Sequence, residues 1–274
     1  MRTIKEVFQK TKTQGNGALV GYIMAGDPKP ELTVQIADAL IRGGIDVLEL
    51  GLPFSDPIAD GPTIQAASVR ALAAGTTPLK VFEIAKEIHQ SHDVPIVIMT
   101  YYNPVFRMGL ERFCALAKKC MVDGFIIPDL PLEEADEYKK AAGKAGLDTI
   151  FLAAPSTRNE RLAKIVGASS GFLYLVSHFG VTGAQTEVAD STVQLVERVL
   201  PFTTGKIALA VGFGISKPKH AARIIGAGAD GVIVGSVFIN IIQKRQGNIE
   251  AMLKELQATA QALKAATKVY RSSV

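Results

Sequence analysis

One carboxylate interrupts a short apolar run in the first quarter of the chain. The run Val47–Leu50 is typical of a buried strand, in which the Glu49 side chain points away from those of Leu48 and Leu50. An unpaired carboxylate is costly to bury, and burial raises its pKa towards neutrality. Such a group suits general acid or base catalysis, so we expect Glu49 to be catalytic. The alternative is a structural glutamate paired with a lysine at the rim of the fold.

A long, proline-rich loop follows this strand and carries two more carboxylates. It runs from Gly51 to Pro62 and contains Asp56 and Asp60. Long loops of this kind often act as lids, and Asp60 can fold back over Glu49. Two carboxyl groups in different surroundings can divide the acid and base work of one reaction. The alternative is that both aspartates form turns or cap helices.

Glycine-rich turns follow the last two predicted strands and indicate an anion site. One turn is Gly212–Ser216, and the other is Gly235 with Ser236, ahead of a short helical stretch over Val237–Ile242. Glycines let backbone N–H groups approach a phosphate, and a helix N-terminus adds its dipole. A third glycine turn, Gly180–Gly183, can close over the same group. The alternative is that these segments form tight turns only.

Other catalytic groups are missing where they would be needed. No predicted strand holds a lysine for a Schiff base, since Lys206 precedes its strand. Among the histidines only His178 directly follows a strand, which disfavours a metal site. No serine or cysteine stands beside a base in a triad arrangement. The residues therefore predict proton transfer by carboxylates on a phosphorylated small molecule.

The elements that position these residues repeat as strand, loop and helix. Eight such units predict a single (β/α)8 TIM barrel that spans residues 1–274, with an extra amphipathic helix over Thr3–Lys12. An open doubly wound sheet is the competing arrangement, but no glycine-rich fingerprint follows the first strand. The predicted strands are Ala18–Met24, Val47–Leu50, Pro95–Tyr101, Gly124–Ile127, Thr149–Ala153, Gly171–Val176, Ile207–Val211 and Gly231–Val234.

Composition limits the class of protein. The 274 residues are 48% hydrophobic and 20% charged, which excludes a disordered chain. The net charge of +4 is too small to favour nucleic acid, and apolar runs stop well short of the about 20 residues of a spanning helix. The two cysteines, Cys114 and Cys120, face apart on one predicted helix. We therefore expect a cytoplasmic protein without disulfides, membrane segment or signal peptide.

The motifs together resemble one enzyme family along essentially the whole chain. The segment 48–65, with the sequence LELGLPFSDPIADGPTIQ, is similar to the signature of the tryptophan synthase α subunit. Five shorter motifs agree in order: AGDP at 25–28, YYNP at 101–104, PDLP at 128–131, GVTG at 180–183 and GFGIS at 212–216.

This resemblance implies a reaction and two catalytic roles. The family cleaves indole-3-glycerol phosphate to indole and glyceraldehyde 3-phosphate by a retro-aldol reaction. The resemblance makes Glu49 the acid and base at indole C3 and the glycerol hydroxyl, and Asp60 the acceptor for the indole N–H. The ring is the electron sink, so the resemblance implies no cofactor and no metal in this chain.

The resemblance also implies binding residues and a partner. The implied partner is the β subunit, which carries pyridoxal phosphate, in an α2β2 heterotetramer. The phosphate ligands would be Gly183, Gly214, Gly235 and Ser236. The indole pocket and its closing loop would use Tyr22, Tyr101, Ile126, Leu152, Tyr174, Thr182, Phe213 and Ile233, although barrel filling is the alternative for the apolar members. The partner would contact Asp56, Pro57, Asn103, Pro104 and Asp129.

Some positions depart from the family pattern. Tyr22 and Met24 stand where the family often has Phe and Thr, and His178 with Phe179 replaces a basic residue followed by a small one. Three other interpretations stay open. They are a stand-alone indole-releasing lyase, a non-catalytic α-like subunit that activates a β partner, and another phosphate-binding barrel.

Overall fold

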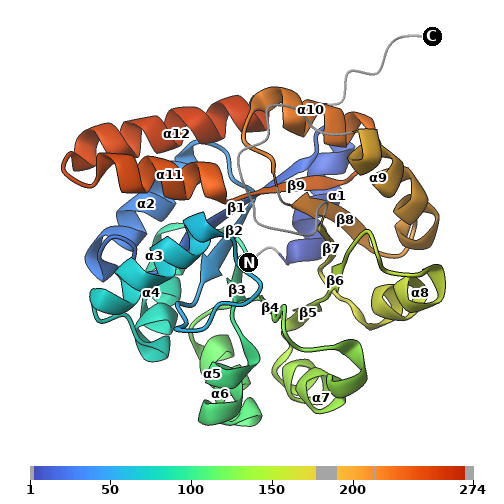
Figure 1. Cartoon of the computed structure of the whole chain (residues 1–274), viewed down its shortest axis with the longest axis horizontal. Coiled ribbons are helices and arrows are strands. Elements are labelled where there is room, and N and C mark those ends of the chain that lie inside the picture. Colours follow the sequence, from blue (N-terminus) through green and yellow to red (C-terminus); the bar gives the residue numbers. More distant parts are fainter. Residues whose placement is uncertain (1–2, 177–189, 213, 269–274) are drawn as a thin grey trace.

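Parallel strands form one nearly continuous ring (Figure 1). The computed structural model describes residues 3–176, 190–212 and 214–268. Nine strands hydrogen-bond in the order β5-β4-β3-β2-β1-β9-β8-β7-β6. The two edge strands, β5 (Asp148–Ile150) and β6 (Leu152–Ala153), are separated only by Phe151, whose carbonyl accepts from Tyr174 N–H at 3.1 Å. They act as one interrupted strand, so the ring is the predicted eight-stranded TIM barrel.

The remaining elements agree closely with the predicted pattern. A 3-10 turn, η1 (Leu132–Glu134), precedes α7, and a short helix, α5, lies between β3 and α6. Gly109, with φ +88°, separates α5 from α6. The other strands are β1 Ala18–Met24, β2 Val47–Gly51, β3 Ile96–Met99, β4 Gly124–Ile126, β7 Phe172–Val176, β8 Ala208–Gly212 and β9 Gly231–Val234. The helices are α1 Ile4–Thr13, α2 Pro30–Arg42, α3 Pro62–Ala73, α4 Pro78–Ser91, α5 Tyr102–Met108, α6 Leu110–Lys119, α7 Asp136–Ala145, α8 Asn159–Ala168, α9 Asp190–Thr203, α10 Pro218–Gly226, α11 Ser236–Arg245 and α12 Ile249–Ala265.

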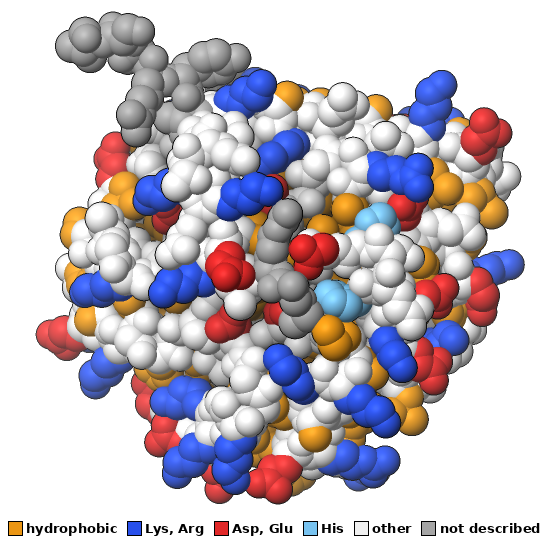
Figure 2. Space-filling view, turned by 180° about the vertical axis from the view of Figure 1, so that it is seen from behind, with side chains coloured by type: hydrophobic (Ala, Val, Ile, Leu, Met, Phe, Trp, Pro, Cys, Tyr) orange, Lys and Arg blue, Asp and Glu red, His pale blue; other side chains and the backbone are white. Residues whose placement is uncertain are grey.

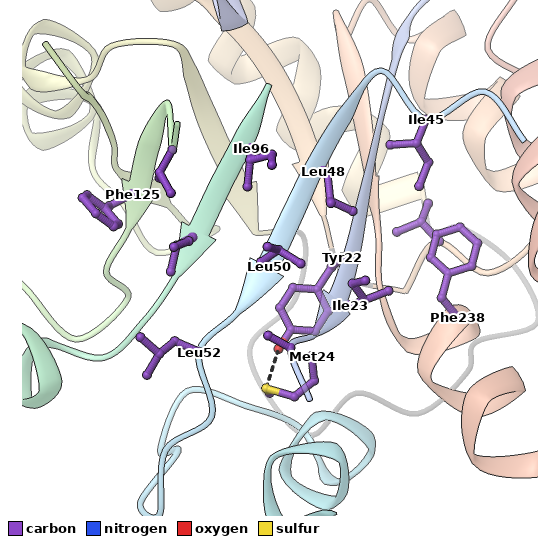
Figure 3. Close-up of a cluster of buried hydrophobic side chains, with 14 of the residues drawn as sticks. Tyr22, Ile23, Met24, Ile45, Leu48, Leu50, Leu52, Ile96, Phe125 and Phe238 are labelled. Atoms are coloured by element: carbon purple, nitrogen blue, oxygen red, sulfur yellow. Dashed lines mark hydrogen bonds between the residues drawn. The ribbon is translucent and has the colours of Figure 1, made fainter. Parts of the chain in front are cut away.

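Alternate residues of each strand pack into two separate apolar clusters. Figure 3 shows Leu48 and Leu50, which belong to the cluster between the strands and the outer helices. Val20 and Val47, in register on β1 and β2, belong to the cluster inside the barrel. Because side chains alternate along a strand, Glu49 shares the inner face with Val47. The fold itself therefore directs this carboxylate into the barrel.

The N-terminal helix α1 closes one end of the barrel. Its side chains Ile4, Val7 and Phe8 are buried in the inner cluster, and the Phe8 ring lies 5.5 Å from that of Phe172. A capping box between Thr3 and Glu6 fixes where the helix begins. This confirms the extra helix expected from the sequence. With that end filled, ligands have access from the carboxyl ends of the strands.

Aspartates that precede three of the strands tie neighbouring strands together. Each carboxylate accepts a hydrogen bond from a backbone N–H in the first two residues of the adjacent strand. Asp46 accepts from Leu19 at 2.7 Å, Asp123 from Ile96 at 2.8 Å and Asp230 from Leu209 at 2.9 Å. These links explain why short Asp-containing turns recur before strands in the sequence.

Charged side chains of both signs lie on the surface, and both cysteines are buried. Lys and Arg side chains are interspersed with Asp and Glu on the face seen in Figure 2. Within the described ranges, no helix combines the length and apolar character needed to cross a bilayer. Cys114 and Cys120 are both buried free thiols, as expected.

Candidate active site

A cavity of about 300 Å³ gathers residues from opposite sides of the barrel, at the carboxyl ends of the strands and in the loops that follow them. This is the end at which TIM-barrel enzymes place their chemistry. Eight of the residues expected at the site line this one cavity. They are Tyr22, Glu49, Asp60, Tyr174, Gly214, Ile233, Gly235 and Ser236.

Glu49 is fully buried and lines the cavity. Neither carboxyl oxygen has a hydrogen-bond partner in the part of the chain that the structure describes, and no described lysine pairs with it. Burial raises the pKa of Glu49 to about 8, with a further contribution from the negative charge of Asp60. The alternative of a glutamate held by a lysine at the rim does not fit this environment.

Asp60 lies at the end of the β2–α3 loop and is partly buried. Burial raises its pKa to about 6, opposed by a hydrogen bond with the Tyr101 hydroxyl. The N-cap residue of α3 is Gly61 and not Asp60, and the helix has no side-chain cap. The Asp60 carboxylate therefore does not cap the helix. Its carboxylate, like that of Glu49, remains available to a ligand in the cavity.

Tyr101 holds the loop that carries Asp60. Its hydroxyl accepts a hydrogen bond from Ala59 N–H at 2.9 Å, and its ring stacks on Phe54 at a centroid distance of 5.3 Å. Tyr101 was expected to line the indole pocket, but it does not line the cavity. It lies instead behind Asp60 and contacts the loop near both of its ends.

Two other apolar candidates lie outside the cavity lining. Ile126 is fully buried inside the barrel, and Leu152 packs against the same inner cluster. Both fit the alternative of barrel filling. Gly183, Thr182 and Phe213 lie outside the described residues, as do His178 and Phe179.

Glycines and a helix N-terminus line one end of the cavity. Gly214 has φ +78°, a conformation that disfavours any side chain. A Cβ on Gly235 would lie 3.1 Å from the Tyr22 ring, so the glycine keeps this wall open. Ser236 begins α11, where unpaired N–H groups and the helix dipole favour an anion. The arrangement supports the predicted phosphate site.

Tyr22 brings a buried hydroxyl group close to the two carboxylates. Figure 3 shows this hydroxyl aimed at the Met24 sulfur, 4.0 Å away. Burial raises the pKa of Tyr22 well above its usual value, and the charges of Asp60 and Glu49 raise it further. The two departures from the family pattern, Tyr22 and Met24, therefore contact each other.

Sequence reasoning missed several residues of the cavity wall. Thr63 and Ile64 lie in the first turn of α3, directly after the long loop, and Asn240 lies one turn after Ser236 on α11. The helical spacing of four residues was a signal for Asn240, since it shares a helix face with Ser236. Met99 and Lys217 were also missed. Four further lining residues lie in segments that the sequence analysis singled out without giving them an individual role: Gly61, Ile215, Ser216 and Val237.

The residues expected to face a partner lie on neighbouring loops outside the cavity. Asp56, Asn103 and Asp129 are exposed, and Asp129 accepts a hydrogen bond from Tyr102 N–H at 2.9 Å. Pro57 and Pro104 are partly buried beside them. Large apolar side chains are exposed on the same segments, with Ile58 at 82% and Phe106 at 69%. Such a mixture is typical of a protein interface.

Metal ligands do not cluster in the part of the molecule described. No group of three or more His, Cys, Asp or Glu residues there has the geometry to hold an ion. The titratable groups of the described cavity lining are the carboxyl groups of Glu49 and Asp60, the hydroxyls of Tyr22 and Tyr174, and the side chain of Lys217.

Known proteins are similar to this chain in sequence and in fold. The family model for the tryptophan synthase alpha chain matches residues 8–268. The tryptophan synthase alpha chain of Methanosarcina acetivorans is 51% identical over 93% of both chains, and that of Methanoregula boonei is 47% identical over 98% of this chain and 99% of its own. A crystal structure of the alpha chain from Legionella pneumophila superposes with a TM-score of 0.89 at 35% identity, covering 99% of both chains. A structure of Mycobacterium tuberculosis tryptophan synthase gives a TM-score of 0.88 at 35% identity, covering 97% of this chain and 98% of that one. On this evidence the chain belongs to the tryptophan synthase alpha chain family.

Proposed function

We propose that this chain cleaves indole-3-glycerol phosphate to indole and glyceraldehyde 3-phosphate, with residues 1–274 acting as one catalytic domain. The observation that carries the proposal is the pair of carboxylates in one cavity, Glu49 with a pKa of about 8 and Asp60 with a pKa of about 6. At neutral pH the first is mostly protonated and the second mostly ionised. One group can therefore donate a proton while the other accepts a hydrogen bond.

In this mechanism Glu49 both donates a proton and takes one back. Its carboxylic acid protonates indole C3, which leaves positive charge on the ring, and Asp60 stabilises that charge through the indole N–H. The resulting Glu49 carboxylate then removes the proton of the adjacent glycerol hydroxyl. The carbon–carbon bond breaks, its electron pair returns to the ring, and Glu49 is again protonated. The cycle needs neither an oxidant nor a cofactor in this chain.

The rest of the cavity suits the two ends of this substrate. Gly214, Gly235 and Ser236 would bind the phosphate through backbone N–H groups and the serine hydroxyl, with Gly183 as a fourth ligand. Tyr22, Tyr174 and Ile233 line the same cavity and would supply apolar walls for the indole ring. Phe213 and Thr182 would complete the pocket and its closing loop.

The family also suggests a partner. We assign the exposed loops around Asp56, Asn103 and Asp129 to contact with a β subunit that carries pyridoxal phosphate, in an α2β2 assembly. Exposed Ile58 and Phe106 support this assignment, since their burial would stabilise such a complex. A cytoplasmic location is consistent with both free cysteines.

Indole release by the purified chain tests the proposal. Indole-3-glycerol phosphate is supplied to the chain alone and then with a β subunit added. We expect slow release that rises strongly with the partner, because a partner bound at these loops would favour the conformation that places Asp60 for catalysis. Fast release without a partner would instead identify a stand-alone lyase. No release in either case would leave only a non-catalytic role.

A further inference from the structure

Two residues at the glycine-lined end of the cavity have no role in the account above. Ser216 and Lys217 line the cavity on the segment between β8 and α10, next to Gly214. Lys217 is the N-cap residue of α10 and makes no side-chain cap. Both residues share the cavity lining with Gly214 and Gly235, the proposed phosphate ligands.

Ser216 carries a buried hydroxyl without a protein partner. Within the described ranges its Oγ is buried and accepts or donates no hydrogen bond. Its backbone N–H is already used, since it donates to Nδ1 of the buried His220 at 3.4 Å and so helps to fix the turn. Buried polar groups are normally paired, and an unpaired one in a cavity wall indicates a ligand or water oxygen beside it.

Lys217 is the only lysine or arginine that the structure places in the cavity lining, and no described carboxylate forms an ion pair with it. The same cavity holds the carboxyl groups of Glu49 and Asp60. A phosphate monoester brings a charge of about −1.5 to −2 at pH 7, which the ionised Asp60 would repel. Backbone N–H groups and a serine hydroxyl supply no full positive charge, so among the described lining residues only Lys217 can supply one.

We propose that the Ser216 hydroxyl and the Lys217 ammonium group bind the phosphate of the substrate and extend the glycine site into a charged one. The inference rests on the proposed function and deepens it, because it identifies the cation that selects a phosphorylated substrate. Neither residue takes part in proton transfer. Their loss therefore weakens substrate binding in preference to the chemical step.

Steady-state kinetics with two variants of Lys217 test whether its positive charge binds the phosphate. Lys217→Met should raise the KM for indole-3-glycerol phosphate and the inhibition constant of inorganic phosphate, each by roughly 10-fold. Lys217→Arg should restore most of the affinity. Lys219→Met on the same helix is the matched control, because Lys219 is exposed and does not line the cavity. Changes below about twofold in Lys217→Met, or equal changes in Lys219→Met, would overturn the proposal.

Ser216→Ala separates ligand binding from a structural role. Because the hydroxyl has no described protein partner, the variant should unfold at the same temperature as the parent chain or higher, yet show a KM raised several-fold. A lowered melting temperature with an unchanged KM would remove Ser216 from the site. Failure of the parent chain to release indole would count against the proposed function itself. Direct binding of inorganic phosphate, measured by isothermal titration calorimetry on the parent chain and Lys217→Met, would then still decide the role of Lys217.

Discussion

Glu49 on β2 lies in register with Tyr22 on β1, and both side chains line the cavity that Asp60 completes. Parallel neighbours in register point to the same face of a sheet, so the barrel places an aromatic wall beside the buried acid. The phenol ring and the apolar interior below it remove water from Glu49. This desolvation is the main cause of its raised pKa.

The different pKa values of the two carboxyl groups predict a bell-shaped pH profile. Asp60 must be ionised and Glu49 protonated, so kcat/KM should rise through about pH 6 and fall above about pH 8. The phosphate of the substrate also titrates near 6, which makes the alkaline limb the diagnostic one. Initial rates from pH 5 to 9.5 measure it. A profile that stays flat up to pH 9.5 would contradict the assignment of Glu49 as the acid.

Removal of the Tyr101 hydroxyl should act through Asp60. Tyr101→Phe loses the hydrogen bond from Ala59 N–H and the one that lowers the pKa of Asp60. We expect kcat/KM to fall about 10-fold and the acid limb of its profile to move to higher pH. Tyr138→Phe is a suitable control, because the Tyr138 hydroxyl is buried without a described partner and the residue does not line the cavity. An acid limb that moves to lower pH would refute this role.

A side chain at Gly235 should block the phosphate. A Cβ there already approaches the Tyr22 ring to 3.1 Å, and a branched side chain would extend into the cavity. Gly235→Val is expected to raise KM by more than about 10-fold, a loss of roughly 1.4 kcal/mol in binding. Gly143→Ala in α7, where a Cβ meets nothing within 4 Å, serves as a control with unchanged kinetics. If KM stays the same in the valine variant, the anion site lies elsewhere.

One buried ion pair should dominate the stability of the loop after β1. Arg70 on α3 donates to both oxygens of Asp27, at 2.7 and 2.8 Å, and the Asp27 side chain is fully buried. Arg70→Met would leave that carboxylate unpaired and should lower the free energy of unfolding by about 3–5 kcal/mol. Because burial raises the pKa of Asp27 and Arg70 opposes the rise, the loss should be larger at pH 8 than at pH 5.

Arg42→Met gives the matched comparison for this pair. It breaks the i,i+4 ion pair of Arg42 with Asp38, whose side chains are 68% and 33% exposed. Urea denaturation should show a cost below about 1 kcal/mol for this change. Equal costs for the two arginine variants would show that burial does not control the strength of the Asp27 pair.

Much of the fold and the site follows from local pattern. The apolar runs and glycine turns predict the barrel, because strands buried on both faces need both signals. Glu49 could be found from its place within an apolar run, and Asp60 from the loop that follows. Gly235 and Ser236 could be found because a glycine before a helix suits an anion.

The remaining features depend on contacts between distant segments. The role of Tyr101 depends on how the β2–α3 loop folds. The contacts of Tyr101 with Ala59 and Phe54 join segments more than 40 residues apart in the chain, so the local sequence pattern does not predict them. The division of the fifth strand at Phe151 arises from closure of the barrel between β5 and β7. Ile126 and Leu152 have the same polarity and strand position as true pocket residues, and only the packing of the interior separates them.

Glu49→Gln should leave the fold intact and stabilise it at alkaline pH. Glu49 has a pKa of about 8 in the folded chain against 4.5 ordinarily, so the folded state holds the extra proton between these values. The parent chain therefore loses stability as pH rises from about 4.5 to about 8, whereas a neutral amide does not titrate. In urea titrations the advantage of the variant should grow with pH across this window. A constant difference would mean that Glu49 is not protonated when folded.

Indole release by the Glu49→Gln variant is the most direct test of the central claim. It is measured with saturating indole-3-glycerol phosphate, with and without a β subunit, beside the parent chain. The amide can neither donate the proton to C3 nor remove the hydroxyl proton, so kcat should fall by at least about 1,000-fold while phosphate still binds. Release within about 10-fold of the parent rate would show that another group moves these protons and would contradict the assignment of Glu49.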